Sequence, residues 1–180
     1  MPAVSAGILL YVDAVELRVL LAHPGGPYFS RKDAGAWTIP KGLVNDQEDL
    51  ELAARREFEE ELGWAPAGAA LSLGHVKLRS GKVVHGFAIR GGEAEPSLLA
   101  RFRPGTFSME WPPKSGRSAE FPEVDRIGFF TLREARSLLA EAVACCGRSC
   151  NVINLRNVPD ELGPRRQSSD GRQSVRVARK

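Results

Sequence analysis

The sequence predicts an α/β fold in which helices flank a mixed β-sheet. Short apolar runs occur in pairs joined by a few polar residues, which is typical of β-hairpins. Two longer segments, 46–62 and 132–145, carry apolar residues at helical spacing. Because hairpins replace regular βαβ units, the fold is expected to be a mixed sheet with helices packed on it.

The first 41 residues predict extended segments. Residues 6–12 and 17–22 are apolar runs separated by four residues, so they are expected to form a hairpin. The loop that follows, HPGGPYF, is rich in Gly and Pro. WTIPK at 37–41 is a short extended piece, because Pro40 disfavours helical backbone at the residue before it.

Residues 46–62 predict the strongest helix of the chain. Asn45 or Asp46 is expected to cap it, and Gly63 is expected to end it. An apolar residue recurs at every fourth position and gives the helix one stripe to bury: Leu50, Ala54, Phe58 and Leu62.

A second hairpin is predicted from 71–79 and 83–90, turning at Ser80 and Gly81. Its strands contain His75 and His85, which are expected to be hydrogen-bonded structural histidines. Residues 91–122 are rich in Gly, Pro and charge, and predict a long irregular segment with a functional role.

The last predicted elements are a strand over 126–130 and a helix over 132–145. Thr131 and Glu134 have the spacing of a capping box at the start of that helix. Residues 1–145 are therefore expected to be one domain, followed by an extension over 146–180. Residues 163–180 are expected to be disordered, because they contain few apolar residues.

Charge and composition exclude several classes of protein. The net charge is +3, but 163–180 alone contain six basic residues and one acid, so the rest of the chain is slightly acidic. This argues against a nucleic-acid-binding face on the folded domain. No apolar run is long enough to span a membrane, and the N-terminus does not resemble a signal peptide, so a cytoplasmic location is expected. Three cysteines are interpreted as reduced thiols: Cys145, Cys146 and Cys150.

Four glutamates crowd the end of the first helix, in the sequence REFEEELG at 56–63. On a helical wheel Glu57 and Glu61 border the apolar stripe, whereas Glu59 lies on the opposite side. Like charges one turn apart repel each other, and the negative end of the helix dipole adds to that cost. Two interpretations remain open: a site for a hard divalent cation, or an acidic surface balanced by neighbouring arginines.

The wider pattern resembles the Nudix box, G-x5-E-x7-R-E-U-x-E-E-x-G-U, where U is a bulky apolar residue. Residues 42–64 meet all nine constrained positions, from Gly42 through Glu48 to Trp64. The segments HPGGP, EWPPKSGR and FPEVDR resemble a bacterial branch predicted to be nucleoside triphosphate pyrophosphohydrolases.

This resemblance implies an α/β/α sandwich and hydrolysis, dependent on Mg²⁺ or Mn²⁺, of a nucleoside diphosphate linked to another group. The metal ligands it implies are three glutamates and a carbonyl oxygen: Glu57, Glu60, Glu61 and Gly42. It also implies an ion pair between Arg56 and Glu48 that orients the cluster. A dinucleoside polyphosphate hydrolase and a catalytically silent nucleotide sensor are the alternatives.

Further candidates lie outside the box. Three basic residues are candidates for binding phosphate: Lys41, Lys114 and Arg117. Four acids of the later loops are candidates for the general base, with Glu120 or Glu123 preferred: Glu110, Glu120, Glu123 and Asp125. The expected partner is a small nucleotide substrate, and the sequence leaves the oligomeric state open, a homodimer included.

Overall fold

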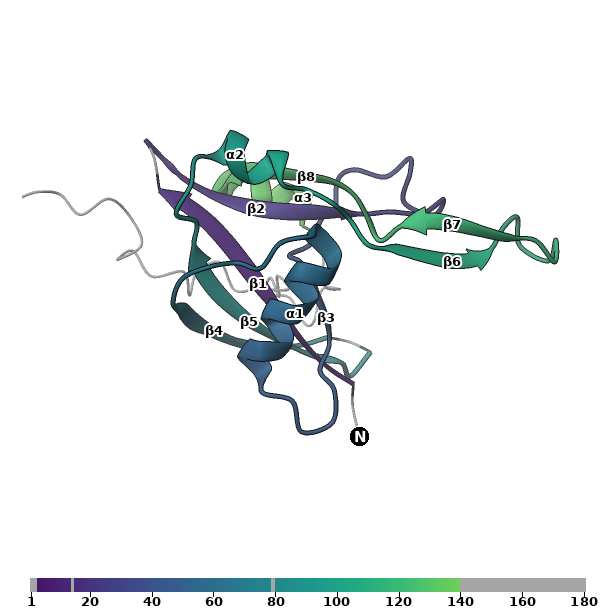
Figure 1. Cartoon of the computed structure of the whole chain (residues 1–180), viewed down its shortest axis with the longest axis horizontal. Helices are drawn as coiled ribbons and strands as arrows, with labels where there is room; N and C mark the ends of the chain where they lie inside the picture. The colour runs from purple at the N-terminus through teal and green to yellow at the C-terminus, as the bar shows by residue number, and fades with distance from the viewer. Residues whose placement is uncertain (1–2, 14, 79, 140–180) are drawn as a thin grey trace, which may run out of the picture.

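The computed structural model describes residues 3–13, 15–78 and 80–139 (Figure 1). Its main sheet has the strand order β4-β5-β1-β2-β8, and β3 pairs with β1. The strands are β1 (Val4–Asp13), β2 (Leu17–Pro24), β3 (Lys41–Leu43), β4 (Ala70–Lys77), β5 (Val83–Arg90) and β8 (Val124–Thr131). β1 and β5 are parallel, whereas the other neighbours are antiparallel, so the predicted mixed sheet is confirmed.

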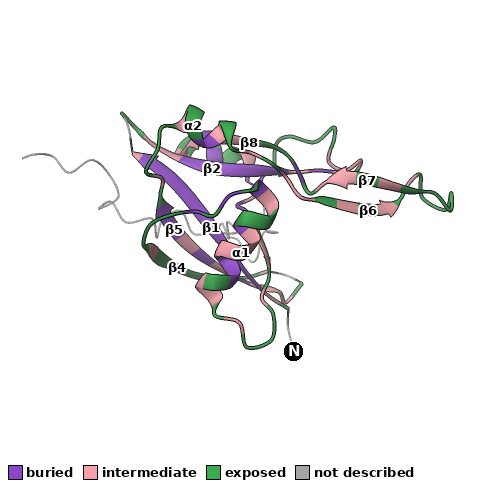
Figure 2. Cartoon of the chain, viewed as in Figure 1, coloured by how far each residue is buried: buried purple, intermediate pink, exposed green. Residues whose placement is uncertain are grey.

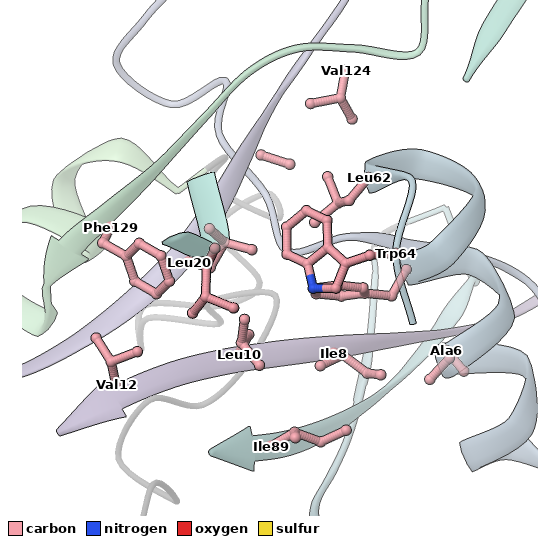
Figure 3. Packing of buried hydrophobic residues seen from close by; sticks show 14 of the residues in the cluster. Ala6, Ile8, Leu10, Val12, Leu20, Leu62, Trp64, Ile89, Val124 and Phe129 are labelled. Carbon is pink, nitrogen blue, oxygen red and sulfur yellow. The ribbon is translucent and has the colours of Figure 1, made fainter. Parts of the chain in front are cut away.

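Helices cover both faces of this sheet, which makes three layers. α1 (Leu50–Leu62) lies across one face, where its Phe58 and Leu62 join a buried cluster with residues of β1. Figure 3 shows Leu62 in this cluster with Ile8 and Leu10 of β1. α3 (Leu132–Leu138) packs on the other face with the alternate residues of β1. The predicted α/β class and sandwich are therefore confirmed.

The central strand β1 shows why its sequence is a nearly continuous apolar run. Its residues alternate between the two core clusters, so neither face is solvated, and Figure 2 shows the strand buried along most of its length. A strand covered on both sides supplies a rigid base for the elements that pair with it, and β3 leads from there into α1.

The predicted start of α1 was wrong by four residues. The helix begins at Leu50, and its cap is Asp49, whose carboxylate accepts hydrogen bonds from the backbone N–H groups of Glu51 and Leu52. The expected caps, Asn45 and Asp46, lie in the preceding loop. The predicted end was right, because Gly63 adopts the left-handed conformation with φ of 88°.

The segment 91–122 was wrongly expected to be irregular. It contains α2 (Glu95–Ala100) and a separate hairpin of β6 (Thr106–Glu110) and β7 (Ser118–Pro122), which projects from the body of the molecule (Figure 1). One face of the hairpin is partly buried and pairs Phe107 with Phe121 across the strands. Five-residue strands of this kind are difficult to predict from the sequence, because Gly and Pro residues lie between them.

The remaining predictions were largely right. Both long hairpins and the strand around 126–130 are present, and Thr131 forms the capping box with Glu134. α3 ends at Leu138, before the expected end at 145, and Leu139 has extended backbone. Positions 140–180, with the three cysteines and the tail, lie outside the described residues. Among the helices of the described part, none is long and apolar enough to cross a membrane.

Candidate active site

Arg56, in the middle of α1, binds Glu48 through two hydrogen bonds. Its Nε donates to Glu48 Oε1 at 2.8 Å, and its Nη2 donates to Glu48 Oε2 at 2.9 Å. Glu48 also accepts a hydrogen bond from the backbone N–H of Asn45, which fixes the loop that precedes the helix. The Arg56 guanidinium and this N–H together lower the pKa of Glu48 to about 2. The expected ion pair is therefore present, in the bidentate geometry that only arginine provides.

The same guanidinium also connects two glutamates of α1 to the loop. Nη1 donates to Glu57 Oε1 at 2.8 Å and to Glu60 Oε2 at 3.1 Å, and Nη2 donates to the carbonyl of Leu43 at 2.9 Å. The bonds to carboxylates raise the pKa of Arg56, with the Glu48 bond contributing most. One cation thus holds three carboxylates and a backbone oxygen in place.

Gly42 of β3 lies directly beneath Glu57. A Cβ built on Gly42 would overlap the Glu57 carboxylate, so any other residue would displace that carboxylate from the position seen. The Glu57 side chain is only 15% exposed, in keeping with this close approach to β3. The glycine at the start of the motif is therefore explained by contact with its first helix glutamate.

Glu61 is partly buried and lies next to Lys41. Burial raises the pKa of Glu61 to about 7, and the charges of Glu57 and Glu123 add to the rise. The Lys41 ammonium and its backbone N–H, which is hydrogen-bonded to this carboxylate, oppose the rise. Burial lowers the pKa of Lys41 in turn, against the opposite influence of Glu61. Glu59 is exposed, as the helical wheel predicted.

Glu123 is the one candidate base of the later loops that reaches the cluster in the described part of the chain. It links β7 to β8, and its backbone is fixed on both sides by bonds to Gly25 and Gly105. A Cβ on Gly105 would lie 3.0 Å from the Glu60 carbonyl oxygen and 3.2 Å from Glu123 Oε2, so Glu123 adjoins the end of α1. Partial burial, then the charges of Glu57 and Glu60, raise the pKa of Glu123.

The other three candidate bases have different surroundings. Glu110 accepts a hydrogen bond from the backbone N–H of Gly116 within the β6–β7 turn. Asp125 is hydrogen-bonded to Nδ1 of the buried His23 at 2.7 Å. Glu120 lies on the exposed face of β7. None of these interactions involves the carboxylate cluster of α1.

Lys114 and Arg117, the other candidate phosphate-binding residues, lie in the turn between β6 and β7. Both are exposed, and Figure 1 shows this turn at the outer end of the projecting hairpin, away from α1. The structure therefore brings Lys41 to the carboxylate cluster but does not bring Lys114 or Arg117 there.

The donor set suits a hard divalent cation, because carboxylate oxygens gather at one end of a rigid helix beside a backbone turn. Within residues 3–13, 15–78 and 80–139, no three acidic, histidine or cysteine side chains are grouped closely enough to enclose an ion in the conformation seen. Two of the acids instead share Arg56, whose Nη1 donates to both Glu57 and Glu60. In the conformation seen, the positive charge next to Glu57 and Glu60 is the Arg56 guanidinium.

Comparison with known proteins identifies the family. A family model described as the NUDIX domain matches residues 1–144. The chain belongs to the Nudix family. Nudix domains generally use divalent metal ions. No curated protein sequence matches the chain.

Solved structures of other proteins share the fold at low sequence identity. The NUDIX domain of Shewanella oneidensis NrtR, complexed with ADP ribose, is 16% identical with a TM-score of 0.51, over 78% of this chain and 80% of that one. A MutT/nudix family protein from Listeria innocua is 20% identical with a TM-score of 0.51, over 78% and 86%. A C. elegans Ap4A hydrolase is 19% identical with a TM-score of 0.50, over 74% and 84%.

Proposed function

We propose that this Nudix protein is a metal-dependent hydrolase that cleaves a pyrophosphate bond in a nucleoside diphosphate linked to another group. Glu57, Glu60 and Glu61 would hold Mg²⁺ or Mn²⁺, with the carbonyl of Gly42 as a further oxygen ligand. The observation that supports this most is the set of hydrogen bonds from Arg56, which links three acids of the motif: Glu48, Glu57 and Glu60.

Each residue of the cluster then has a separate task. The bound metal would neutralise charge on the diphosphate and make water a better nucleophile. Arg56 and Glu48 orient the carboxylates, because the bidentate pair fixes the guanidinium that binds Glu57 and Glu60. The ammonium group of Lys41 is next to Glu61 and supplies positive charge for a phosphate oxygen.

Glu123 is the proposed general base. Its carboxylate would accept the proton of the attacking water while the water oxygen forms a bond to phosphorus. The bridging P–O bond breaks in the same displacement, and the leaving phosphate oxygen takes the electron pair. The raised pKa of Glu123 suits this task, since a base is most effective with a pKa near the working pH.

The direct test is hydrolysis of a nucleotide panel with Mg²⁺, with Mn²⁺ and with EDTA. The panel contains NTPs, oxidised NTPs, nucleotide sugars, ADP-ribose and diadenosine polyphosphates. Products formed in ¹⁸O-labelled water show which phosphorus is attacked. Turnover of any member that requires the metal and disappears in Glu61→Gln supports the proposal. Absence of turnover across the panel would favour a silent nucleotide sensor instead.

Glu123→Gln and Glu120→Gln are a matched pair for the base. Both residues are exposed acids at the same end of the hairpin, but only Glu123 adjoins the cluster. We expect Glu123→Gln to lower kcat by about 100-fold or more, as loss of a general base does, and Glu120→Gln to leave it unchanged. Equal effects of the two substitutions would show that the base lies elsewhere.

A further inference from the structure

A pair of histidines lies outside the carboxylate cluster, on the edge of the sheet. His75 of β4 is directly opposite His85 of β5 in the antiparallel register, and their ring centroids are 5.2 Å apart with a tilt of 36°. β4 is one of the two strands that end the order of the main sheet. We propose that His75 and His85 form a second metal site, which binds a divalent transition-metal ion that prefers nitrogen ligands, such as Zn²⁺ or Ni²⁺.

The separation of the rings matches the geometry of a shared ion. Zinc lies about 2.0–2.1 Å from a histidine nitrogen, and the ring centre is roughly 1.2 Å further away. Two rings on one ion would then have centres about 4.6 Å apart at a right angle and about 5.3 Å apart at the tetrahedral angle. The observed 5.2 Å falls within this interval, so both rings can bind without a change of strand register.

Both rings are available for binding. Within the described residues neither of these two rings makes a hydrogen bond, contrary to the structural role expected from the sequence, whereas His23 uses both of its ring nitrogens. His75 is exposed and His85 is half-buried, so an ion reaches the pair from solvent. Burial, and then the neighbouring His75, lower the pKa of His85. The neutral imidazole that binds metal is therefore favoured near pH 7.

The pair differs from the carboxylate cluster in chemistry. Imidazole nitrogens suit Zn²⁺, Ni²⁺ and Cu²⁺, whereas carboxylate oxygens suit Mg²⁺ and Mn²⁺. Water would complete the coordination, because two side chains fill only half of a tetrahedral site. An ion bound here would join the edge strand β4 to β5, and would stabilise the native state by mass action.

The histidine ring signals in NMR spectra offer a direct test, with Ni²⁺ as a paramagnetic probe in excess Mg²⁺. The chain has three histidines, and the buried, doubly hydrogen-bonded His23 is an internal control. We expect substoichiometric Ni²⁺ to broaden the signals of His75 and His85 and to leave that of His23 sharp. His75→Asn should abolish the broadening of His85, and His85→Asn that of His75.

Two further variants distinguish the His75–His85 pair from non-specific binding and from binding at the carboxylate cluster. His75→Asn combined with Lys77→His keeps three histidines but places the new one diagonal to His85, so its response to Ni²⁺ should be much weaker. Glu61→Gln should leave the broadening intact, because the site does not involve the carboxylate cluster. The proposal is overturned if no signal broadens, if all three broaden together, or if either single His→Asn variant still binds through the remaining ring.

Discussion

Burial of Glu61 should make the metal-free protein less stable at neutral pH than at acid pH. The pKa of Glu61 is about 7 in the folded protein, against an ordinary value of 4.5. A raised folded-state pKa means that the fold favours the protonated acid. The contribution of Glu61 to the free energy of unfolding is therefore fully present below pH 4.5, and it is lost as the pH rises to about 7. A rise of this size corresponds to about 3 kcal/mol, which is an upper estimate because the buried site can relax.

Glu61→Gln removes the ionisation while keeping an oxygen for the hydrogen bond from Lys41. In EDTA, the free energy of unfolding of the variant should exceed that of the wild type by up to about 3 kcal/mol at about pH 8. The difference should shrink toward zero at about pH 4.5. Urea unfolding at several pH values measures it, and subtracting the two curves cancels the other titrating groups.

Glu59→Gln is the matched control, since Glu59 is on the same helix but faces solvent. Its unfolding free energy should follow that of the wild type at every pH. Burial of the Glu61 charge is refuted as the cause if Glu61→Gln and the wild type show the same dependence on pH, or if Glu59→Gln reproduces the effect. The first result would mean that the Glu61 carboxylate is solvated in the native protein, and the second that the effect does not depend on burial of the Glu61 side chain.

Three other perturbations have expected outcomes. Arg56→Ala should lower turnover by about 10–100-fold, because it releases Glu48, Glu57 and Glu60 together; a wild-type rate would show that the pairing has no role. Gly42→Ala should lower kcat by about 100-fold, because the added Cβ displaces the Glu57 carboxylate. Steady-state kinetics that give kcat and KM separately measure this effect, and unchanged values would contradict the steric argument. Deletion of 163–180 should change neither the melting temperature nor the rate of turnover. A decrease in either quantity would show that the tail belongs to the fold.

The sequence predicted the orientation of the glutamates because helical periodicity is a local property. The apolar stripe ending in Leu62 determined which side of α1 is buried, and the surroundings of Glu57, Glu59 and Glu61 followed from it. The start of the helix did not follow, since Asp46 and Asp49 are both acceptable caps in isolation. Contacts of Glu48 explain why Asp49 is the cap. The Glu48 carboxylate accepts hydrogen bonds from Arg56 and from the backbone N–H of Asn45, and these bonds keep the preceding loop out of the helix.

The base candidate could not be predicted from the sequence because it depends on tertiary contacts. Glu120 and Glu123 are three residues apart in a segment without clear periodicity. Their separation in space results from the β6–β7 hairpin, which the Gly and Pro content concealed, and from backbone bonds of Glu123 to Gly25 and Gly105. A signal was available in Phe107 and Met109, which alternate with polar residues in β6 and face Phe121 and Ala119.

The structure also explains how four glutamates can crowd one helix end. Glu59 faces solvent, where its charge is screened. Glu57 and Glu60 share a single guanidinium, so their mutual repulsion is offset by Arg56. Glu61 is relieved instead by Lys41 and by its own raised pKa, which keeps a large fraction protonated near pH 7. The four acids are thus tolerated for three different reasons. A divalent cation held by Glu57, Glu60 and Glu61, as proposed above, would add a further counter-charge to those of Arg56 and Lys41.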